Sequence, residues 1–254
     1  MRGGKFRLSF PLSAHTWTPH FSSDTLRAYR ATARGRRSQS LAVIRRDKLL
    51  RMDGENVQFT MLVVCDGNVC RSPSAQFELE KLLPEVRVES AGMRARTNTR
   101  LCAVVFDALS AWEPGGASYA QRFRSQRILD LDLTRFDLVV TATRDQRADL
   151  TRQNPQIRDR FFTLREADMI LRAQAAESLT GALRSALVPG MNALRGLAPR
   201  SDAGSSPSAI ADAHPFDIPD AHAARSRRHR AVIDLSLRTA SSMGESLGVL
   251  LRRA

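Results

Sequence analysis

The sequence predicts an α/β domain in which helices flank a parallel β-sheet. Two observations predict this fold class. The stretch FTMLVVC at residues 59–65 is a short, apolar, β-rich run of the kind that parallel sheets bury on both faces. From there on, strand-like and helix-like stretches alternate along the chain, which is typical of βαβ units with right-handed crossovers. We therefore expect a layered domain that begins at Phe59.

Each expected element has its own local signature. PSAQFELEKLL at residues 73–83 combines helix-forming residues with apolar positions, and Ser72 and Pro73 supply a cap and a first helical position. VRVESAG at residues 86–92 alternates as a strand does and stops at Gly92. Two more strands are expected at RFDLVVTAT (135–143) and DRFFTL (159–164), and further helices at RLCAVVFDALSAW (100–112), RDQRADLTRQ (144–153) and 224–253.

Two regions depart from this pattern. Residues 1–58 hold 12 Lys or Arg against four acids, so we expect a basic N-terminal extension that is disordered or weakly helical. There are two alternatives: an arm that binds nucleic acid or an acidic partner, and an artefact of start-site choice. Nucleic acid is disfavoured as the partner because aromatic residues do not interleave the arginines. Residues at about 173–214 are rich in Gly, Pro and Ser, which predicts a loop insertion within a domain spanning 59–254.

Composition limits the class of protein. The formal net charge of +13 favours anionic ligands or surfaces without selecting one. Three cysteines do not suggest the disulfide framework of a small secreted domain, so we expect a reducing, cytoplasmic location. No apolar run approaches the roughly 18 residues that a membrane span needs, so we expect a soluble protein without a membrane partner.

The segment VVCDGNVCRSPSA carries the most chemical information. Cys65 ends the first strand, and the next helix follows after a loop of five residues and Arg71. In a parallel sheet this edge is where ligands bind, and a helix N-terminus with converging backbone N–H groups can hold a tetrahedral anion. The same donors stabilise a thiolate, so we expect Cys65 to be the nucleophile. The expected phosphate-binding residues are Asp66, Gly67, Asn68, Val69, Cys70, Arg71 and Ser72.

Individual residues of this segment have expected roles. Gly67 and Asn68 tolerate the strained backbone that a tight loop needs. Arg71 offers a planar fork of donors for two phosphate oxygens. The Ser72 hydroxyl is positioned in sequence to donate to the Cys65 sulfur. Cys70 either traps oxidised Cys65 as a disulfide or fills space under the loop.

Plainer interpretations remain open. A cysteine at the end of a buried strand is often a small core residue, and two cysteines near each other also suggest a metal or redox pair. A zinc site needs two more ligands, and Cys102, which lies in an apolar helical pattern, has no nearby partner in sequence. The spacing of His214, His222 and His229 does not suggest a metal site, so we expect surface histidines, no metal and no cofactor.

The segment VCDGNVCRSPSA resembles the phosphate-binding signature of the low-molecular-weight protein tyrosine phosphatases, a family that includes related arsenate reductases. Further similar stretches are VESAG, FDLVVTATRDQRADL, FFTLREA and FDIPDAHA. The resemblance implies a four-stranded parallel sheet flanked by helices, no metal, and a general-acid aspartate near the C-terminus. Asp220 is the aspartate that aligns, and Asp217 is the alternative. Ala221 and His222 stand where the family often has Pro and an aromatic residue.

Three functions follow from these residues. The first is a phosphomonoester hydrolase acting on phosphorylated protein, most simply phosphotyrosine, or on a small aryl phosphate. Cys65 would attack phosphorus, Arg71 would hold its oxygens, and Asp220 would protonate the leaving group. The second is an arsenate reductase that uses a low-molecular-weight thiol. The third is a phosphate-binding protein that has lost catalysis.

Overall fold

The computed structural model describes residues 58–176, 184–195, 213–222 and 226–252. The expected basic extension lies outside these residues, apart from its last position. Much of the expected insertion lies outside them as well. No helix among the described residues is long and apolar enough to cross a lipid bilayer.

A four-stranded parallel sheet forms the centre of the protein, as the sequence predicts. Its strands are β1 (Phe59–Cys65), β2 (Val86–Gly92), β3 (Leu138–Thr141) and β4 (Phe161–Thr163), in the order β2-β1-β3-β4. The register pairs Cys65 with Gly92 and Val64 with Thr141. The carboxyl ends of the two central strands and of β2 therefore lie at one edge of the sheet, where the candidate site forms.

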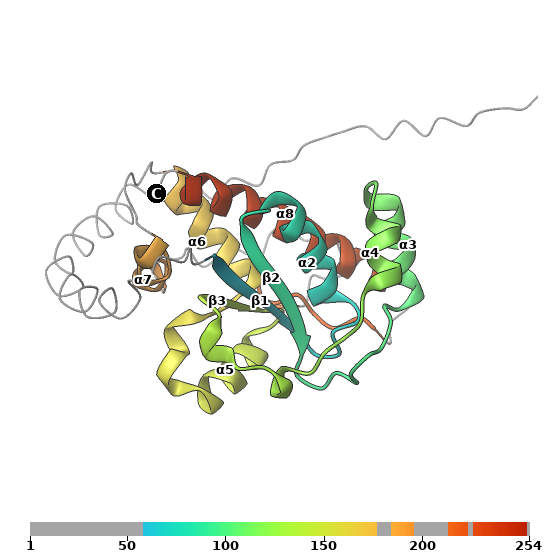
Figure 1. Ribbon diagram of the computed structural model, residues 1–254, viewed down its shortest axis with the longest axis horizontal. Coiled ribbons are helices and arrows are strands. Elements are labelled where there is room, and N and C mark those ends of the chain that lie inside the picture. Colours follow the sequence, from blue (N-terminus) through green and yellow to red (C-terminus); the bar gives the residue numbers. More distant parts are fainter. Residues whose placement is uncertain (1–57, 177–183, 196–212, 223–225, 253–254) are drawn as a thin grey trace, which may run out of the picture.

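Helices cover both faces of the sheet (Figure 1). α2, α6 and α8 lie on one side, and α5 lies on the other. The helices are α2 (Arg71–Leu82), α3 (Ala103–Trp112), α4 (Gly116–Arg122), α5 (Arg144–Gln153), α6 (Leu164–Ala176), α7 (Arg184–Leu194) and α8 (Ser226–Arg252), with short 3-10 turns η1 (Ile128–Asp130), η2 (Leu133–Arg135) and η3 (Pro155–Arg160).

The apolar run of β1 is buried on both faces, which explains why it lacks an alternating pattern. Met61, Val63 and Cys65 point into a core shared with α2, α6, α7 and α8. Leu62 and Val64 point into a second core shared with α5 and the 3-10 turns. A third apolar cluster joins α3 and α4 to α2 and α8. Since a strand turns successive side chains to opposite faces, this central strand carries apolar residues at every position after Thr60.

Several sequence expectations need correction. The N-cap of α2 is Cys70 and its first residue is Arg71, so the helix begins before the expected Ser72 and Pro73. Within the stretch expected to be a loop insertion, residues 184–194 form α7, with Pro189 inside it. Leu187, Met191 and Leu194 of α7 join the main core, and this burial outweighs the loop-like composition around them.

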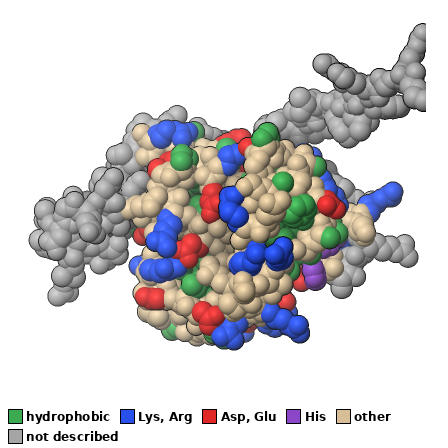
Figure 2. All heavy atoms as spheres, turned by 45° about the vertical axis from the view of Figure 1, so that its right-hand side comes forward, with side chains coloured by type: hydrophobic (Ala, Val, Ile, Leu, Met, Phe, Trp, Pro, Cys, Tyr) green, Lys and Arg blue, Asp and Glu red, His purple; other side chains and the backbone are tan. Residues whose placement is uncertain are grey.

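Figure 2 presents one face of the molecule. There, basic side chains are interspersed with acidic ones, and they do not form one continuous basic area. The described face therefore does not show the basic stripe that marks a typical nucleic-acid interface.

Asp168 of α6 gives the fold a pH-dependent cost. One of its carboxylate oxygens is buried without a hydrogen-bond partner among the described residues. Burial raises the pKa of Asp168 to about 6, although a hydrogen bond from Ser242 and the charges of Arg172 and Arg165 act in the opposite direction. A raised carboxyl pKa means that the folded state holds the proton more tightly, so stability is lost as pH rises from about 4 through about 6.

We expect Asp168→Asn to raise stability at pH 7.5 by roughly 1 to 3 kcal/mol and to flatten stability between pH 4 and 7. Urea unfolding at several pH values measures this. Asp107→Asn is a matched control, because it removes the same charge from an exposed helical position. Equal effects of both substitutions would show that net charge, and not the burial of Asp168, is responsible.

Candidate active site

The loop at residues 66–70 connects β1 to α2 at the carboxyl edge of the sheet. Cys65 ends β1 and is only 2% exposed. The segment after β2 anchors the start of the loop, because Met93 N–H donates to the Cys65 carbonyl (2.9 Å) and Arg94 N–H to the Asp66 carbonyl (2.8 Å). The loop is thus fixed by backbone hydrogen bonds to the segment that follows β2.

Asn68 holds the loop in its curved form. It has a positive φ of 50°, a conformation that asparagine tolerates better than most residues. Its side chain is fully buried and donates to the hydroxyls of Ser72 (2.9 Å) and Ser90 (2.8 Å). Its amide oxygen accepts a hydrogen bond from Gln126 N–H at 2.9 Å. One side chain therefore joins the loop, α2, β2 and the segment before η1.

Gly92 makes room for this arrangement. A Cβ at this position would lie 2.6 Å from the Asp66 carbonyl oxygen and 2.8 Å from the Asn68 nitrogen. Because both contacts are to backbone atoms of the loop, no side chain can be accommodated without displacing it. The glycine at which the sequence ends the second strand is therefore required by the close approach of the loop.

Two donors point at the Cys65 sulfur. The Ser72 hydroxyl donates to it at 3.0 Å, as expected from the sequence, and Asn68 N–H donates at 3.3 Å. Both groups direct a proton at the sulfur. Ser72 is itself held by Asn68, so its hydroxyl has a fixed orientation toward the sulfur.

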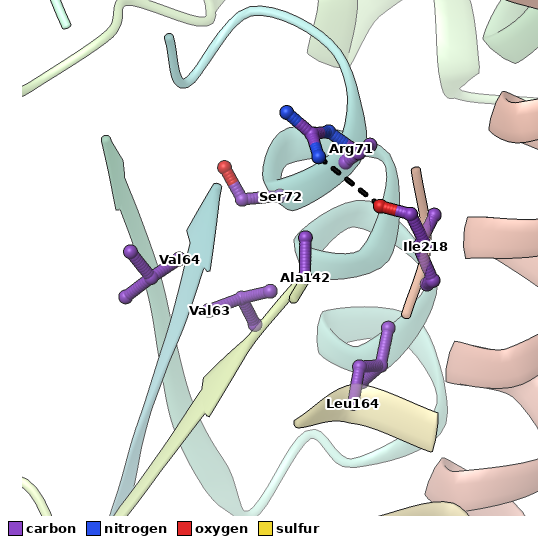
Figure 3. Close-up of a pocket in the computed structure, with 7 residues that line it drawn as sticks. All are labelled: Val63, Val64, Arg71, Ser72, Ala142, Leu164 and Ile218. Atoms are coloured by element: carbon purple, nitrogen blue, oxygen red, sulfur yellow. Dashed lines mark hydrogen bonds between the residues drawn. The ribbon is translucent and has the colours of Figure 1, made fainter. Parts of the chain in front are cut away.

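Arg71, the first residue of α2, reaches the C-terminal segment at residues 217–222. The guanidinium is buried, with 5% of the side chain exposed, and donates to the Ile218 carbonyl at 3.1 Å (Figure 3). It also forms an ion pair with Asp220, whose carboxylate oxygen lies 2.9 Å from Nη2. The structure thus pairs Arg71 with Asp220, two of the three side chains for which the sequence predicts catalytic roles.

Asp220 has a mixed environment. Partial burial raises the pKa of this carboxyl, but the N–H of His222, which donates at 2.8 Å, and the charge of Arg71 lower it, so that the net pKa lies below the ordinary value. More than half of its side chain, 54%, remains exposed. The carboxylate is therefore anchored to Arg71 and open to solvent.

Asp217, the alternative acid, lies in a different contact. Its carboxylate accepts a hydrogen bond from the backbone N–H of Arg144 at 2.8 Å, at the start of α5, and it pairs with the Arg144 side chain. A carboxylate at a helix N-terminus stabilises that helix. This contact gives Asp217 a structural role at the start of α5.

Two other expected phosphate-binding residues, Asp66 and Val69, contact neighbouring segments of the chain. The Asp66 carboxylate faces Arg94, with which it forms an ion pair at 2.8 Å. The Val69 carbonyl accepts a hydrogen bond from Cys102 N–H at 3.4 Å. The Asp66 carboxylate and the Val69 carbonyl are thus engaged by neighbouring segments.

Sequence reasoning did not identify Ser90 and Gln126, which fix the loop. The Ser90 hydroxyl accepts from Asn68 and donates to Gln76 (2.6 Å), while the Gln126 amide donates to the Ser90 carbonyl (2.8 Å). Ser90 belongs to VESAG, one of the stretches that resemble the phosphatases, and this was a signal for it. Gln126 lies in an irregular segment that gives no comparable signal.

The Cys70 side chain has partners that the sequence did not predict. Its sulfur lies 3.4 Å from Cys102 Sγ, 3.1 Å from His222 Nδ1 and 3.2 Å from His229 Nε2. The expectation that His229 is a surface residue is wrong, because it is 4% exposed; His222 is exposed as expected. Cys102 is half-buried and is the N-cap of α3, and not one of the buried core residues that its helical pattern suggested.

The two sulfurs of this pair are electrostatically coupled. The hydrogen bond between them raises the pKa of Cys70, and burial acts in the same direction. The same hydrogen bond lowers the pKa of Cys102, with help from the backbone at Val105 and from the charges of the two histidines. This coupling favours a state in which the two sulfurs share one proton.

Comparison with known proteins matches this chain to one family. The family described as low molecular weight phosphotyrosine protein phosphatase matches residues 60–180. The probable low molecular weight protein-tyrosine-phosphatase EpsP of Ralstonia solanacearum is 31% identical over 109 residues, which cover 43% of this chain and 72% of EpsP. The low molecular weight protein-tyrosine-phosphatase Wzb of Escherichia coli K12 is 29% identical over 102 residues, covering 40% and 67%.

Solved structures with a similar arrangement include the tyrosine phosphatase Wzb from Escherichia coli K30 in complex with sulphate. It has a TM-score of 0.49 and 18% identity, with 74% of this chain and 97% of that chain covered. The YwlE arginine phosphatase from Geobacillus stearothermophilus has a TM-score of 0.47 and 22% identity, covering 74% and 92%.

Proposed function

Because the chain belongs to the low molecular weight phosphotyrosine protein phosphatase family, whose members are cysteine-dependent hydrolases, we propose that it hydrolyses phosphomonoesters through a phosphocysteine intermediate on Cys65. The observation that carries the proposal is the surroundings of this sulfur. It lies at the end of a central strand, accepts hydrogen bonds from Ser72 and Asn68, and is followed by a helix that begins with a buried arginine.

In the first step, the Cys65 sulfur attacks phosphorus in line with the leaving oxygen. The S–P bond forms as the P–O bond breaks, and Asp220 gives its proton to the departing oxygen. Arg71 and the loop N–H groups hold the three equatorial oxygens, so they stabilise the charge of the transition state. The Ser72 hydroxyl supports the sulfur while it is negatively charged.

In the second step, the phosphocysteine is hydrolysed. The Asp220 carboxylate removes a proton from a water molecule, which attacks phosphorus and breaks the S–P bond. The sulfur leaves as a thiolate, which the Ser72 hydroxyl stabilises, and inorganic phosphate is released. The same carboxyl thus acts first as an acid and then as a base.

Substrate entry requires an exchange of partners at Arg71. In the structure the guanidinium pairs with Asp220, and the phosphoryl group takes the place of that carboxylate in the proposed complex. Losing its cationic partner raises the affinity of Asp220 for a proton, since the charge of Arg71 lowers the pKa of this carboxyl. Substrate binding therefore prepares the acid for the first step.

The proposed substrate is a phosphorylated protein, with phosphotyrosine as the simplest candidate, or a small aryl phosphate. Support comes from curated relatives that are named tyrosine phosphatases. Ala221 and His222 replace the Pro and aromatic residue of the family pattern, so less ring surface is available near Asp220 to contact a phenyl group. We also propose a cytoplasmic location, in keeping with three unpaired cysteines.

Two assays on the full chain test this function. The first measures hydrolysis of an aryl phosphate between pH 5 and 7, and the second measures consumption of a low-molecular-weight thiol with arsenate. We expect turnover in the first assay. Phosphate binding without turnover would overturn the hydrolase proposal, and arsenate-dependent thiol consumption in its place would favour the reductase, which the named relatives do not support.

A further inference from the structure

Four side chains from separate parts of the chain meet beside the phosphate loop. They are Cys70 at the N-cap of α2, Cys102 at the N-cap of α3, His222 in the segment at residues 217–222 and His229 in α8. We call them the Cys/His cluster. One ligand atom from each residue, two sulfurs and two imidazole nitrogens, lies within 4.8 Å of all the others. The sequence separations between Cys70 and the histidines are 152 and 159 residues.

The spacing of these atoms is close to that of a tetrahedral metal site. Cys70 Sγ lies 3.1 to 3.4 Å from the other three ligand atoms, and Cys102 Sγ lies 3.7 Å from His229 Nε2. With metal–sulfur bonds of about 2.3 Å and metal–nitrogen bonds of about 2.0 Å, tetrahedral coordination separates ligand atoms by about 3.3 to 3.8 Å. The shortest separations, from Cys70 Sγ to the two imidazole nitrogens, would lengthen slightly on coordination.

We propose that the Cys/His cluster binds one Zn²⁺ ion. Two thiolates and two imidazoles in tetrahedral array are a ligand set that selects zinc over hard cations such as Mg²⁺ and Ca²⁺. On binding, each thiol gives its proton to solvent, and the two thiolate charges neutralise the ion. The site thus adds no net charge next to Arg71. A route for the ion exists, because Cys102 is half-exposed and His222 is exposed, while Cys70 and His229 close the inner side.

A disulfide is the main alternative for the two cysteines. The sulfurs are 3.4 Å apart, whereas a disulfide bond is about 2.05 Å long, so the cysteines are not bonded in the structure. A disulfide also leaves the convergence of two imidazole nitrogens on the same sulfur without explanation. A metal ion accounts for all four side chains together.

The position of the cluster gives the ion a structural role. Cys70 directly precedes Arg71, and the His222 N–H donates to the Asp220 carboxylate at 2.8 Å. Coordination through these two residues would connect the segment at residues 217–222 to the loop at residues 66–70. His229 would connect both to α8. With four protein ligands the ion has no open position, so it would hold Asp220 in place and not contact substrate.

Metal binding to the full-length, metal-free chain tests the proposal without relying on catalysis. Co²⁺ is the probe, because tetrahedral thiolate coordination gives it visible absorption bands and a sulfur-to-cobalt charge-transfer band. We expect one Co²⁺ per chain, displaced by one Zn²⁺. Cys102→Ser and His222→Ala should each weaken zinc binding more than about 100-fold, since loss of a ligand should exceed the effect of losing its supporting contacts.

Two controls separate this site from others. Cys65→Ser removes the proposed nucleophile and should retain full zinc binding, which excludes metal held by that thiol. His214→Ala removes a histidine outside the cluster and should also retain it. His222→Cys should restore binding with a stronger charge-transfer band, because a third thiolate joins the metal; this guards against loss of fold in the alanine variant. The proposal would be overturned by undiminished zinc binding in Cys102→Ser and His222→Ala, or by a wild type without a tetrahedral cobalt spectrum. Neither result depends on whether the chain hydrolyses phosphate esters.

Discussion

Cys65→Ser is expected to abolish hydrolysis of an aryl phosphate, with a loss of about 10⁴-fold or more. A serine hydroxyl is not ionised at neutral pH, and Ser72 and Asn68 cannot supply the general base that it would need. The measurement is initial rate at saturating substrate. The substitution exchanges one buried atom, so the fold should persist.

Inorganic phosphate binding provides the control for this variant. The loop N–H groups and Arg71 are unchanged, so phosphate should still raise the melting temperature of Cys65→Ser. Activity within tenfold of the wild type would show that Cys65 is not the nucleophile. Loss of both activity and phosphate binding would show instead that the loop itself has changed shape.

Asp220→Asn is expected to lower kcat by about 10²- to 10⁴-fold, because the amide cannot protonate the leaving oxygen. The wild-type rate should fall as pH rises, since the acid works only while it holds its proton. The pH dependence of kcat/KM reports the free protein, in which the pKa of Asp220 is lowered. The fall in kcat/KM should therefore occur at acidic pH. In Asp220→Asn this dependence should disappear.

Asp217→Asn is the matched comparison, because it makes the same chemical change three residues away. The amide oxygen can still accept the hydrogen bond from Arg144 N–H, so mainly the charge at the N-terminus of α5 is lost; stability should fall by about 0.3 to 1 kcal/mol and kcat should stay largely unchanged. An inactive Asp217→Asn beside an active Asp220→Asn would reverse our assignment of the acid.

The sequence predicted the strand, loop and helix around Cys65 because their contacts are local. Ser72 lies seven residues from Cys65 and Asn68 lies three from it, so hydrogen bonds between them follow from the path of the loop. The strands were predictable from equally local patterns: burial on both faces leaves a continuous apolar run in β1 and β3, and β2 shows the alternation of a strand with one more exposed face. The beginning of α2 was misplaced because Cys70, a residue with no strong capping preference, is its N-cap.

Contacts between distant residues were not predictable in the same way. Gln126 meets Asn68 across 58 residues, and the histidines meet Cys70 across more than 150. Spacing rules for metal ligands apply to ligands close in sequence, and the cluster draws each of its four from a separate element. Only the return of α8 against α2 and α3 brings His229 to the cysteines.

In the proposed mechanism, the ion pair between Arg71 and Asp220 makes this carboxylate a competitor of the entering phosphate. Asp220 is tethered to the protein, so its local concentration is high and any ligand that enters must displace it. A monoanion such as chloride or a free carboxylate offers Arg71 little more than Asp220 already does. A phosphate dianion offers two negative oxygens to the guanidinium fork and a third to the loop N–H groups. We therefore expect the Asp220 carboxylate to keep simple monoanions from Arg71, while a phosphate dianion displaces it.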